Sequence, residues 1–168
     1  HQGVIAYVSE VAVQDLDELI QQAYDRGEDP FLIALDGVTD VRNMGAIARS
    51  AECFGAHGMV VPKQFSARLG SDAIKSSAGA LLRKPVCRVL DLASSIRRMK
   101  DHGIKVVACT EKTDRSLDQL DLTGPLVIVV GAEDTGISSS IMQLSDLQGK
   151  IPMAGQIGSL NVSVAAGI

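Results

Sequence analysis

The sequence has no tryptophan and few other aromatic residues, because its 168 residues include only two tyrosines and three phenylalanines. It also has no excess of positive charge, since the formal net charge is −4 at pH 7. Proteins that hold single-stranded nucleic acid on rows of aromatic rings, or by bulk electrostatic attraction, have the opposite composition. We therefore expect any contact with nucleic acid to be local and to depend on shape or ribose groups.

Cysteine and long apolar runs are scarce as well. Cys53, Cys87 and Cys109 are odd in number and widely spaced, which suggests neither a disulfide framework nor a zinc site, and we expect no metal. No apolar run approaches the ~18 residues that span a bilayer. These absences predict a cytoplasmic protein. The first residue is His1 and not methionine, so we expect a further segment before it.

The sequence does contain a regular alternation of short apolar runs and amphipathic stretches. Such runs are typical of strands and such stretches of crossover helices. The pattern predicts an α/β fold with a mainly parallel sheet covered on both faces. The expected strands are Val4–Val8, Phe31–Leu35, Gly58–Val61, Val86–Val89, Ile104–Cys109, Leu126–Val130 and Lys150–Met153. The expected helices are Leu16–Tyr24, Met44–Phe54, Asp72–Leu82, Leu92–His102 and Ser140–Leu147.

The loops after strands are the candidate sites, because open parallel sheets bind ligands beyond the carboxyl ends of their strands. The first loop leads into a helix with Asn43 at its start and Arg49 on its outer face. As structural alternatives, Arg49 pairs with Glu52 and Asn43 caps the helix. The opposite, apolar face of that helix is expected to consist of Ile47, Ala51 and Phe54.

The second loop, Val129–Ser140, superficially resembles a phosphate-binding loop, but Ile137 occupies the lysine position. A nucleoside triphosphatase is therefore disfavoured. Glu133 follows the strand directly, either as a solvated turn residue or as a hydrogen-bond acceptor for a ligand.

The third loop belongs to the final stretch, Ile151–Ile168. Gly155 and Gly158 permit close backbone approach, and Ser159 and Asn161 supply short polar groups. Alone, it would be read as an ordinary glycine-rich turn.

Together the stretches "NMGAIARSA", "VVGAEDTGI" and "IPMAGQIGSLNVSVAAGI" resemble, in order, the three signature motifs of the SpoU/TrmH family of RNA ribose 2′-O-methyltransferases. Within that family the chain is most similar to the bacterial enzymes that methylate a guanosine of 23S rRNA. The resemblance implies a SPOUT fold with a deep trefoil knot at the C-terminus. It also implies that residues 1–30 are a linker from an N-terminal RNA-binding domain, with the boundary at Gly27–Pro30, and that residues 31–168 are the catalytic domain.

The resemblance further implies the cofactor and the roles of individual residues. S-adenosylmethionine would be held largely by backbone groups at Gly131, Ile151 and Leu160, while Thr110 matches only a variable loop of the family. The catalytic arginine falls on Arg49, which would act either as a general base or as a charged group that stabilises the developing alkoxide. The other catalytic positions are Asn43, Glu133, Ser159 and Asn161.

RNA is the implied partner, with ribosomal RNA preferred and transfer RNA the alternative. The candidate contacts are basic residues after a strand end, Lys63, Arg68 and Lys75. The family also implies a homodimer and a helix that continues beyond Ile168. Two alternatives remain open from the sequence: a catalytically idle RNA-binding module, and an enzyme that binds a small nucleotide.

Overall fold

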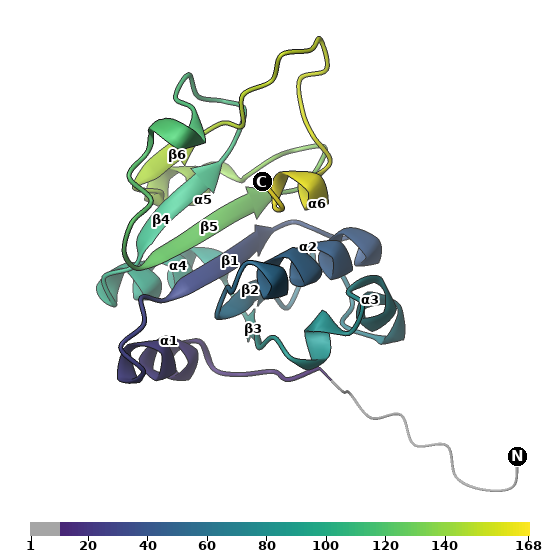
Figure 1. Ribbon diagram of the computed structural model, residues 1–168, viewed down its shortest axis with the longest axis vertical. Coiled ribbons are helices and arrows are strands. Elements are labelled where there is room, and N and C mark those ends of the chain that lie inside the picture. The colour runs from purple at the N-terminus through teal and green to yellow at the C-terminus, as the bar shows by residue number, and fades with distance from the viewer. Residues whose placement is uncertain (1–10) are drawn as a thin grey trace, which may run out of the picture.

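The computed structural model describes residues 11–168, and the expected strand Val4–Val8 lies outside this range. Six strands form one sheet in the order β3-β2-β1-β5-β4-β6, and every pairing between them is parallel (Figure 1). The predicted α/β class with a parallel sheet is confirmed. The strands are β1 (Phe31–Asp36), β2 (Gly58–Pro62), β3 (Val86–Val89), β4 (Lys105–Cys109), β5 (Leu126–Gly131) and β6 (Leu147–Gly149).

Helices cover both faces of this sheet. They are α1 (Leu16–Asp25), α2 (Val41–Cys53), α3 (Ser71–Ser76), α4 (Leu92–Asp101), α5 (Ser139–Leu144) and α6 (Val162–Ala165), with short 3₁₀ turns η1 (Ala80–Leu82) and η2 (Leu117–Gln119). No helix in residues 11–168 is long and apolar enough to cross a membrane.

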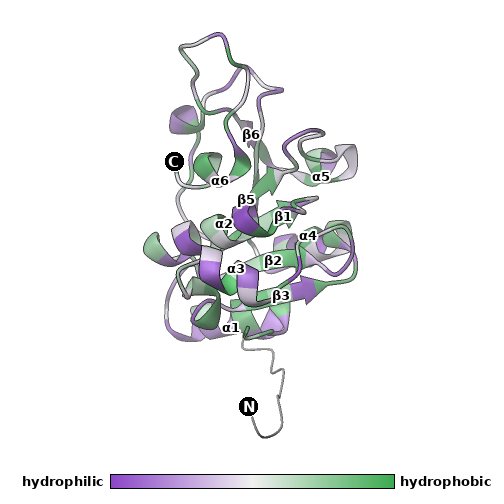
Figure 2. Cartoon of the chain, turned by 90° about the vertical axis from the view of Figure 1, so that its right-hand side faces the viewer, coloured by the Kyte–Doolittle hydropathy of each residue, from purple (hydrophilic) through white to green (hydrophobic). Residues whose placement is uncertain are grey.

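Side chains alternate between the two faces along β1, as the pleat of a strand requires. Leu32 and Ala34 pack in the core that α1, α4 and α5 cover, whereas Ile33 and Leu35 pack in the core under α2, α3 and α6. Figure 2 shows the hydrophobic strands enclosed between α2 on one side and α4 on the other. Both faces of the central strand are therefore buried, which explains its unbroken apolar sequence.

Helix α1 belongs to the same packed core, since Leu16, Leu19 and Ile20 are buried with residues of β1 and β2. The expected boundary at Gly27–Pro30 is the loop between α1 and β1. The division of the chain into a linker segment and a catalytic domain stays a prediction.

The prediction of a strand at Lys150–Met153 was wrong. The last strand is β6, three residues earlier, and α5 ends at Leu144, before the expected Leu147. Asp146 explains the earlier strand. Its carboxylate accepts a hydrogen bond from the backbone N of Val106 (2.9 Å) and forms an ion pair with Lys100 (2.6 Å). These contacts direct the chain into pairing with β4.

Two further expectations needed correction. The stretch predicted as one helix over Asp72–Leu82 is broken after α3, because Ala78 (φ 51°) and Gly79 (φ 82°) adopt left-handed backbone conformations before η1. Phe54 was expected on the buried face of α2, but it caps the C-terminal end of that helix and is 65% exposed.

Candidate functional site

A pocket of about 620 Å³ lies at the carboxyl ends of β4, β5 and β6. Its wall consists of the loops after β4 and β5, the segment after β6, and α6. These segments come together because the carboxyl ends of parallel strands meet at one edge of the sheet. The pocket is lined by all four positions expected to bind the cofactor, Thr110, Gly131, Ile151 and Leu160.

The backbone makes an unusually close approach at Gly131. A Cβ atom built there would lie 2.2 Å from the carbonyl carbon of Gly136 and 2.3 Å from the backbone N of Ile137. The loop returns onto the strand end through a turn in which Gly136 N donates to Ala132 O (2.9 Å), and Gly136 has φ 70°. Only glycine at position 131 leaves room for this turn, so main-chain groups form this part of the pocket wall.

Three side chains from the three sequence motifs meet beside the pocket. Asn43 Nδ2 donates to Glu133 Oε1 (3.1 Å), and Asn161 Nδ2 donates to the same carboxylate oxygen and to Asn43 Oδ1 (3.2 Å). Glu133 is therefore an acceptor for two amides and not only a solvated turn residue. Ser159 lines the pocket, as Glu133 does.

Asn43 is available for this contact because another residue caps α2. The Asp40 carboxylate accepts from the backbone N of Arg42 (2.7 Å) and of Asn43 (3.2 Å), which is the geometry of an N-cap. The Arg42 guanidinium, together with these backbone groups, lowers the pKa of Asp40. The alternative in which Asn43 caps the helix was wrong.

Asn161 has two roles, since it also caps α6. Its Oδ1 accepts from the backbone N of Ser163 (2.9 Å) and from Ser163 Oγ (2.5 Å), while Nδ2 points to Glu133 and Asn43. One side chain thus fixes the start of the last helix and joins it to the loop after β5.

Of the other expected catalytic residues, Ser159 lines the pocket without joining this hydrogen-bonded group, and Arg49 does neither. It lies on the exposed face of α2, about 9 Å along the helix axis from Asn43, and it does not line the pocket. Its expected structural partner is engaged elsewhere, because Glu52 pairs with Lys84 at 3.0 Å. The chain just after α6 packs on α2 at the residue that follows Arg49, because a Cβ at Gly167 would lie 3.4 Å from Ser50 Oγ.

Some pocket residues were missed from the sequence. Lys112 and Lys150 line the pocket, and each follows a strand end closely, which is the signal that could have found them. Asp36, at the end of β1, accepts from the backbone N of Ser138 (2.7 Å) and so anchors the far end of the loop after β5.

Cys109 also lines the pocket, but its thiol is poorly suited to nucleophilic chemistry. Burial, and the negative charge of Glu111, raise the pKa of this thiol. The thiolate is the reactive form, so the shift disfavours reactivity. No group of three or more His, Cys, Asp or Glu residues within 11–168 could hold a metal ion.

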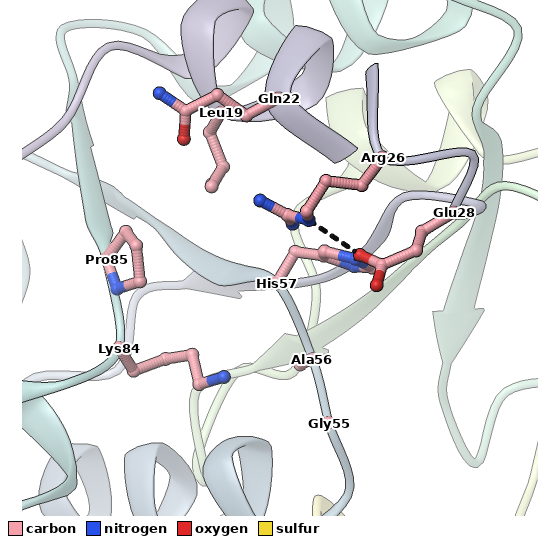
Figure 3. Close-up of a pocket in the computed structure, with 9 residues that line it drawn as sticks. All are labelled: Leu19, Gln22, Arg26, Glu28, Gly55, Ala56, His57, Lys84 and Pro85. Carbon is pink, nitrogen blue, oxygen red and sulfur yellow. Dashed lines mark hydrogen bonds and ion pairs between the residues drawn. The ribbon is translucent and has the colours of Figure 1, made fainter. Parts of the chain in front are cut away.

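A second pocket, of about 450 Å³, lies at the opposite edge of the sheet, where the strands begin (Figure 3). Three of its lining side chains pair with one another, since Arg26 and His57 both contact Glu28, at 2.9 and 3.0 Å. These contacts, from His57 first, lower the pKa of Glu28. His57 Nδ1 also accepts from the backbone N of Phe31 (3.0 Å), so the ring ties two chain segments together. None of the expected site residues lies there, and we assign these contacts a structural role.

Comparison with known proteins places this geometry in a family. The SpoU rRNA Methylase family matches residues 30–168. The chain is 39% identical to YacO of Bacillus subtilis (strain 168), named as a TrmH family tRNA/rRNA methyltransferase, over all of this chain and 68% of that protein. It is 42% identical to a tRNA/rRNA methyltransferase of Mycobacterium sp. (strain KMS), over all of this chain but only 54% of that protein.

Among solved structures, the chain is similar to the SpoU methyltransferase AviRb from Streptomyces viridochromogenes in complex with AdoMet, which is S-adenosylmethionine. The TM-score is 0.77 at 30% identity, over 83% of this chain and 54% of that one. The family predicted from three short motifs is confirmed, and with it the enzyme class, a methyltransferase. The chain belongs to the SpoU rRNA Methylase family.

Proposed function

We propose that this chain transfers a methyl group from S-adenosylmethionine to a ribose 2′-hydroxyl of RNA. The observation that carries the proposal is the hydrogen-bonded group of Asn43, Glu133 and Asn161, which joins three distant segments beside one pocket. Each of the three residues lies in a different one of the motifs that resemble the family's signatures.

The pocket suits S-adenosylmethionine in size and in the character of its wall. Its volume lies within the ~300–1,000 Å³ usual for small-ligand sites. The close backbone approach at Gly131 leaves main-chain groups to hold an adenosine, with further contacts expected from Ile151, Leu160 and Thr110. The AdoMet complex of AviRb supports this cofactor. When bound, it supplies an electrophilic methyl group on a sulfonium.

The protein's share of the chemistry is then to align and activate the 2′-oxygen. Alignment can lower the reaction barrier by up to ~7–11 kcal/mol. A general base typically accelerates a reaction ~10²- to 10⁴-fold, which corresponds to a smaller reduction of the barrier. We assign Asn43, Ser159 and Asn161 to orienting the ribose or the catalytic arginine. Glu133 keeps the motif segments in place, because both amides bond to its carboxylate.

Arg49 is proposed to remain charged and to stabilise the developing alkoxide. A guanidinium rarely gives up its proton, which disfavours the alternative role of general base. Arg49 is exposed and does not line the pocket of its own chain. This position supports an active site that is completed by RNA or by a second copy of the chain.

A homodimer is part of this proposal. Helix α6 packs on α2, and its Val164 leaves an apolar side chain 52% exposed. We also propose that the segment after β6 forms the trefoil knot of the SPOUT fold. The path of this segment supports the knot, because it leaves the sheet at β6 and returns to pack α6 on α2 (Figure 1).

The preferred substrate is a guanosine of 23S rRNA, with transfer RNA as the alternative, and the site of action is the cytoplasm. The names of the relatives mention both transfer RNA and ribosomal RNA. The cytoplasm is supported by Cys53, Cys87 and Cys109, which are free thiols and fit a reducing compartment. The proposed N-terminal RNA-binding domain, joined through residues 1–30, would select the RNA.

Calorimetric titration with S-adenosylmethionine and with ATP tests the cofactor. We expect S-adenosylmethionine to bind and ATP not to, since Ile137 replaces the phosphate-binding lysine and its side chain is buried. Binding of ATP alone would favour the small-nucleotide alternative.

Mapping ribose methylation in cells with and without the gene tests the substrate. The proposal predicts that one 2′-O-methylguanosine of 23S rRNA disappears when the gene is deleted. Loss of a methyl group from transfer RNA would favour the alternative substrate, and an unchanged map would favour an idle RNA-binding module.

A further inference from the structure

The loop between β2 and α3 exposes an aromatic side chain in an unfavourable backbone conformation. Phe65 is 84% exposed, the highest value among the large hydrophobic side chains of residues 11–168, and its φ is 53°. A left-handed conformation costs a residue with a side chain roughly 1–2 kcal/mol. Glycine or asparagine would avoid this cost, so a bulky, solvated ring at this position calls for an explanation.

Hydrogen bonds hold this loop in place on both sides of Phe65. Lys63 N donates to Val89 O on the neighbouring strand (2.8 Å), and Ser66 Oγ donates to Pro62 O (2.5 Å). Ala67 N donates to Val38 O (3.0 Å). The ring is therefore presented by an anchored loop.

The loop lies on the same edge of the sheet as the pocket. The bond from Ala67 joins it to the segment after β1, and there a Cβ at Gly37 would lie 3.4 Å from Cβ of Ala132, a pocket residue. The strand order β2-β1-β5 puts two strand spacings, about 10 Å, between the loop and Gly131. That separation corresponds to about three stacked nucleotides at ~3.4 Å each.

The charges around Phe65 are complementary to a phosphate backbone. Lys63 and Arg68 flank it and are exposed, and the Arg88 guanidinium donates to Lys63 O at 3.0 Å. Of the acidic residues at either end of this surface, Asp91 is engaged in capping α4 through Ser94 N (2.8 Å), and Asp72 lies in the first turn of α3.

We propose that Phe65 stacks on an unpaired base of the RNA, a few nucleotides from the methylated ribose, while Lys63 and Arg68 contact the adjoining phosphates. The inference rests on the proposed function. An exposed ring next to cations, on a fixed loop, is the combination that binds single strands without reading their sequence. The scarcity of aromatic residues excludes a row of such contacts, but not one.

The test measures the affinity of the protein for a fluorescein-labelled single-stranded RNA of about 12 nucleotides and mixed sequence, by fluorescence anisotropy. Phe65→Ala is expected to weaken binding about 5- to 150-fold, the equivalent of the ~1–3 kcal/mol that stacking contributes. Phe65→Tyr keeps the ring and should bind like the wild type. Phe54→Ala is the matched control, because Phe54 is also an exposed phenylalanine but lies at the opposite edge of the sheet.

Salt dependence separates stacking from charge. Phe65→Ala should leave the slope of log affinity against log salt unchanged, whereas Lys63→Ala should reduce it by about 0.7. Calorimetric binding of S-adenosylmethionine to Phe65→Ala should equal that of the wild type, which shows that the variant is folded.

Equal RNA affinities of Phe65→Ala and the wild type would overturn the stacking contact and leave the proposed function standing. A change in oligomeric state in place of RNA affinity, measured by sedimentation, would overturn it in favour of a protein interface. Failure of the wild type to bind RNA at all would contradict both proposals.

Discussion

At the scale of single residues, the three motifs are joined by the side chains of only three residues, with the carboxylate of Glu133 at the centre. It accepts hydrogen bonds from Asn43 and Asn161, whose amides also bond to each other. Two asparagines and one glutamate, all on or near the surface, thus connect α2, the loop after β5 and α6. The two bonds to the carboxylate are charge-assisted and therefore stronger than the bond between the two neutral amides.

Substitution of Arg49 distinguishes its two possible roles. If the guanidinium only stabilises negative charge, Arg49→Lys should retain measurable methyl transfer, whereas Arg49→Ala should lose about 10²- to 10³-fold in kcat. Affinity for S-adenosylmethionine should stay unchanged in both variants, because Arg49 does not line the pocket. Complete inactivity of both variants, with the cofactor still bound, would point to a requirement for the guanidinium itself.

Gly131→Ala tests the backbone wall of the pocket. The new Cβ would lie 2.2 Å from a backbone carbon, so the turn Ala132–Gly136 must shift. We expect affinity for S-adenosylmethionine, measured by calorimetry, to fall about 5- to 150-fold, since overpacking costs ~1–3 kcal/mol.

The matched control for that variant is Gly155→Ala in the last loop, where an added Cβ would meet no atom within 4 Å. It should bind the cofactor like the wild type. Weakened binding by Gly155→Ala with normal binding by Gly131→Ala would show that the wrong loop has been assigned to the cofactor.

At the scale of elements, α2 and α3 approach most closely at Gly45. A Cβ there would lie 1.9 Å from Ser76 Oγ and 2.8 Å from the backbone N of Ser77. Gly45→Ala should therefore destabilise the protein by about 1–3 kcal/mol in urea unfolding, although alanine is the better helix former by ~1 kcal/mol. Gly155→Ala, where nothing lies within 4 Å, should change stability little. A stabilised Gly45→Ala would contradict this packing.

The contact between α1 and α4 should make stability depend on pH. The Arg98 guanidinium lowers the pKa of Asp17 by hydrogen bonding and charge, and His102 Nε2 lies 3.4 Å from Asp17 Oδ1. A carboxyl group whose pKa is lowered on folding stabilises the folded state above its unfolded pKa of ~3.9, and this contribution is lost as pH falls further.

Urea unfolding of Asp17→Asn and the wild type at several pH values checks this. The wild type should be the more stable at neutral pH, and the two proteins should converge as the pH falls below the lowered pKa of Asp17. A difference that grows at low pH would contradict the assignment. The effect should be small, because both side chains are partly exposed to solvent.

Hydrophobic patterning predicted the central strands and the main helices, but not where tertiary contacts end an element. The apolar runs at β1 and β5 are long enough to be read directly. The point at which α5 ends and β6 begins depends on the hydrogen bond between Asp146 and Val106, forty residues earlier. Phe54 is exposed because α2 ends at the residue before it. Likewise, Asn43 is free for Glu133 only because Asp40 caps the helix.

At the scale of the molecule, one parallel sheet brings the loops after β2, β1, β5 and β4 to the same edge in spatial order. The sequence predicted that these loops would gather, and the four cofactor positions do line one pocket. The role of each residue came from the resemblance alone, because periodicity and composition carry no information about methyl transfer. Helical spacing did predict the exposed position of Arg49 on the outer face of α2, but the resemblance alone gave no sign that this residue would lie outside the pocket.

The most direct test of the account is to incubate the protein with RNA and S-adenosylmethionine carrying an isotopically labelled methyl group, digest the RNA to nucleosides, and locate the label by mass spectrometry. We predict that the label appears on the ribose 2′-oxygen, and that Asn43→Ala reduces its amount. Label on a base, or no transfer to RNA that the protein demonstrably binds, would contradict the account.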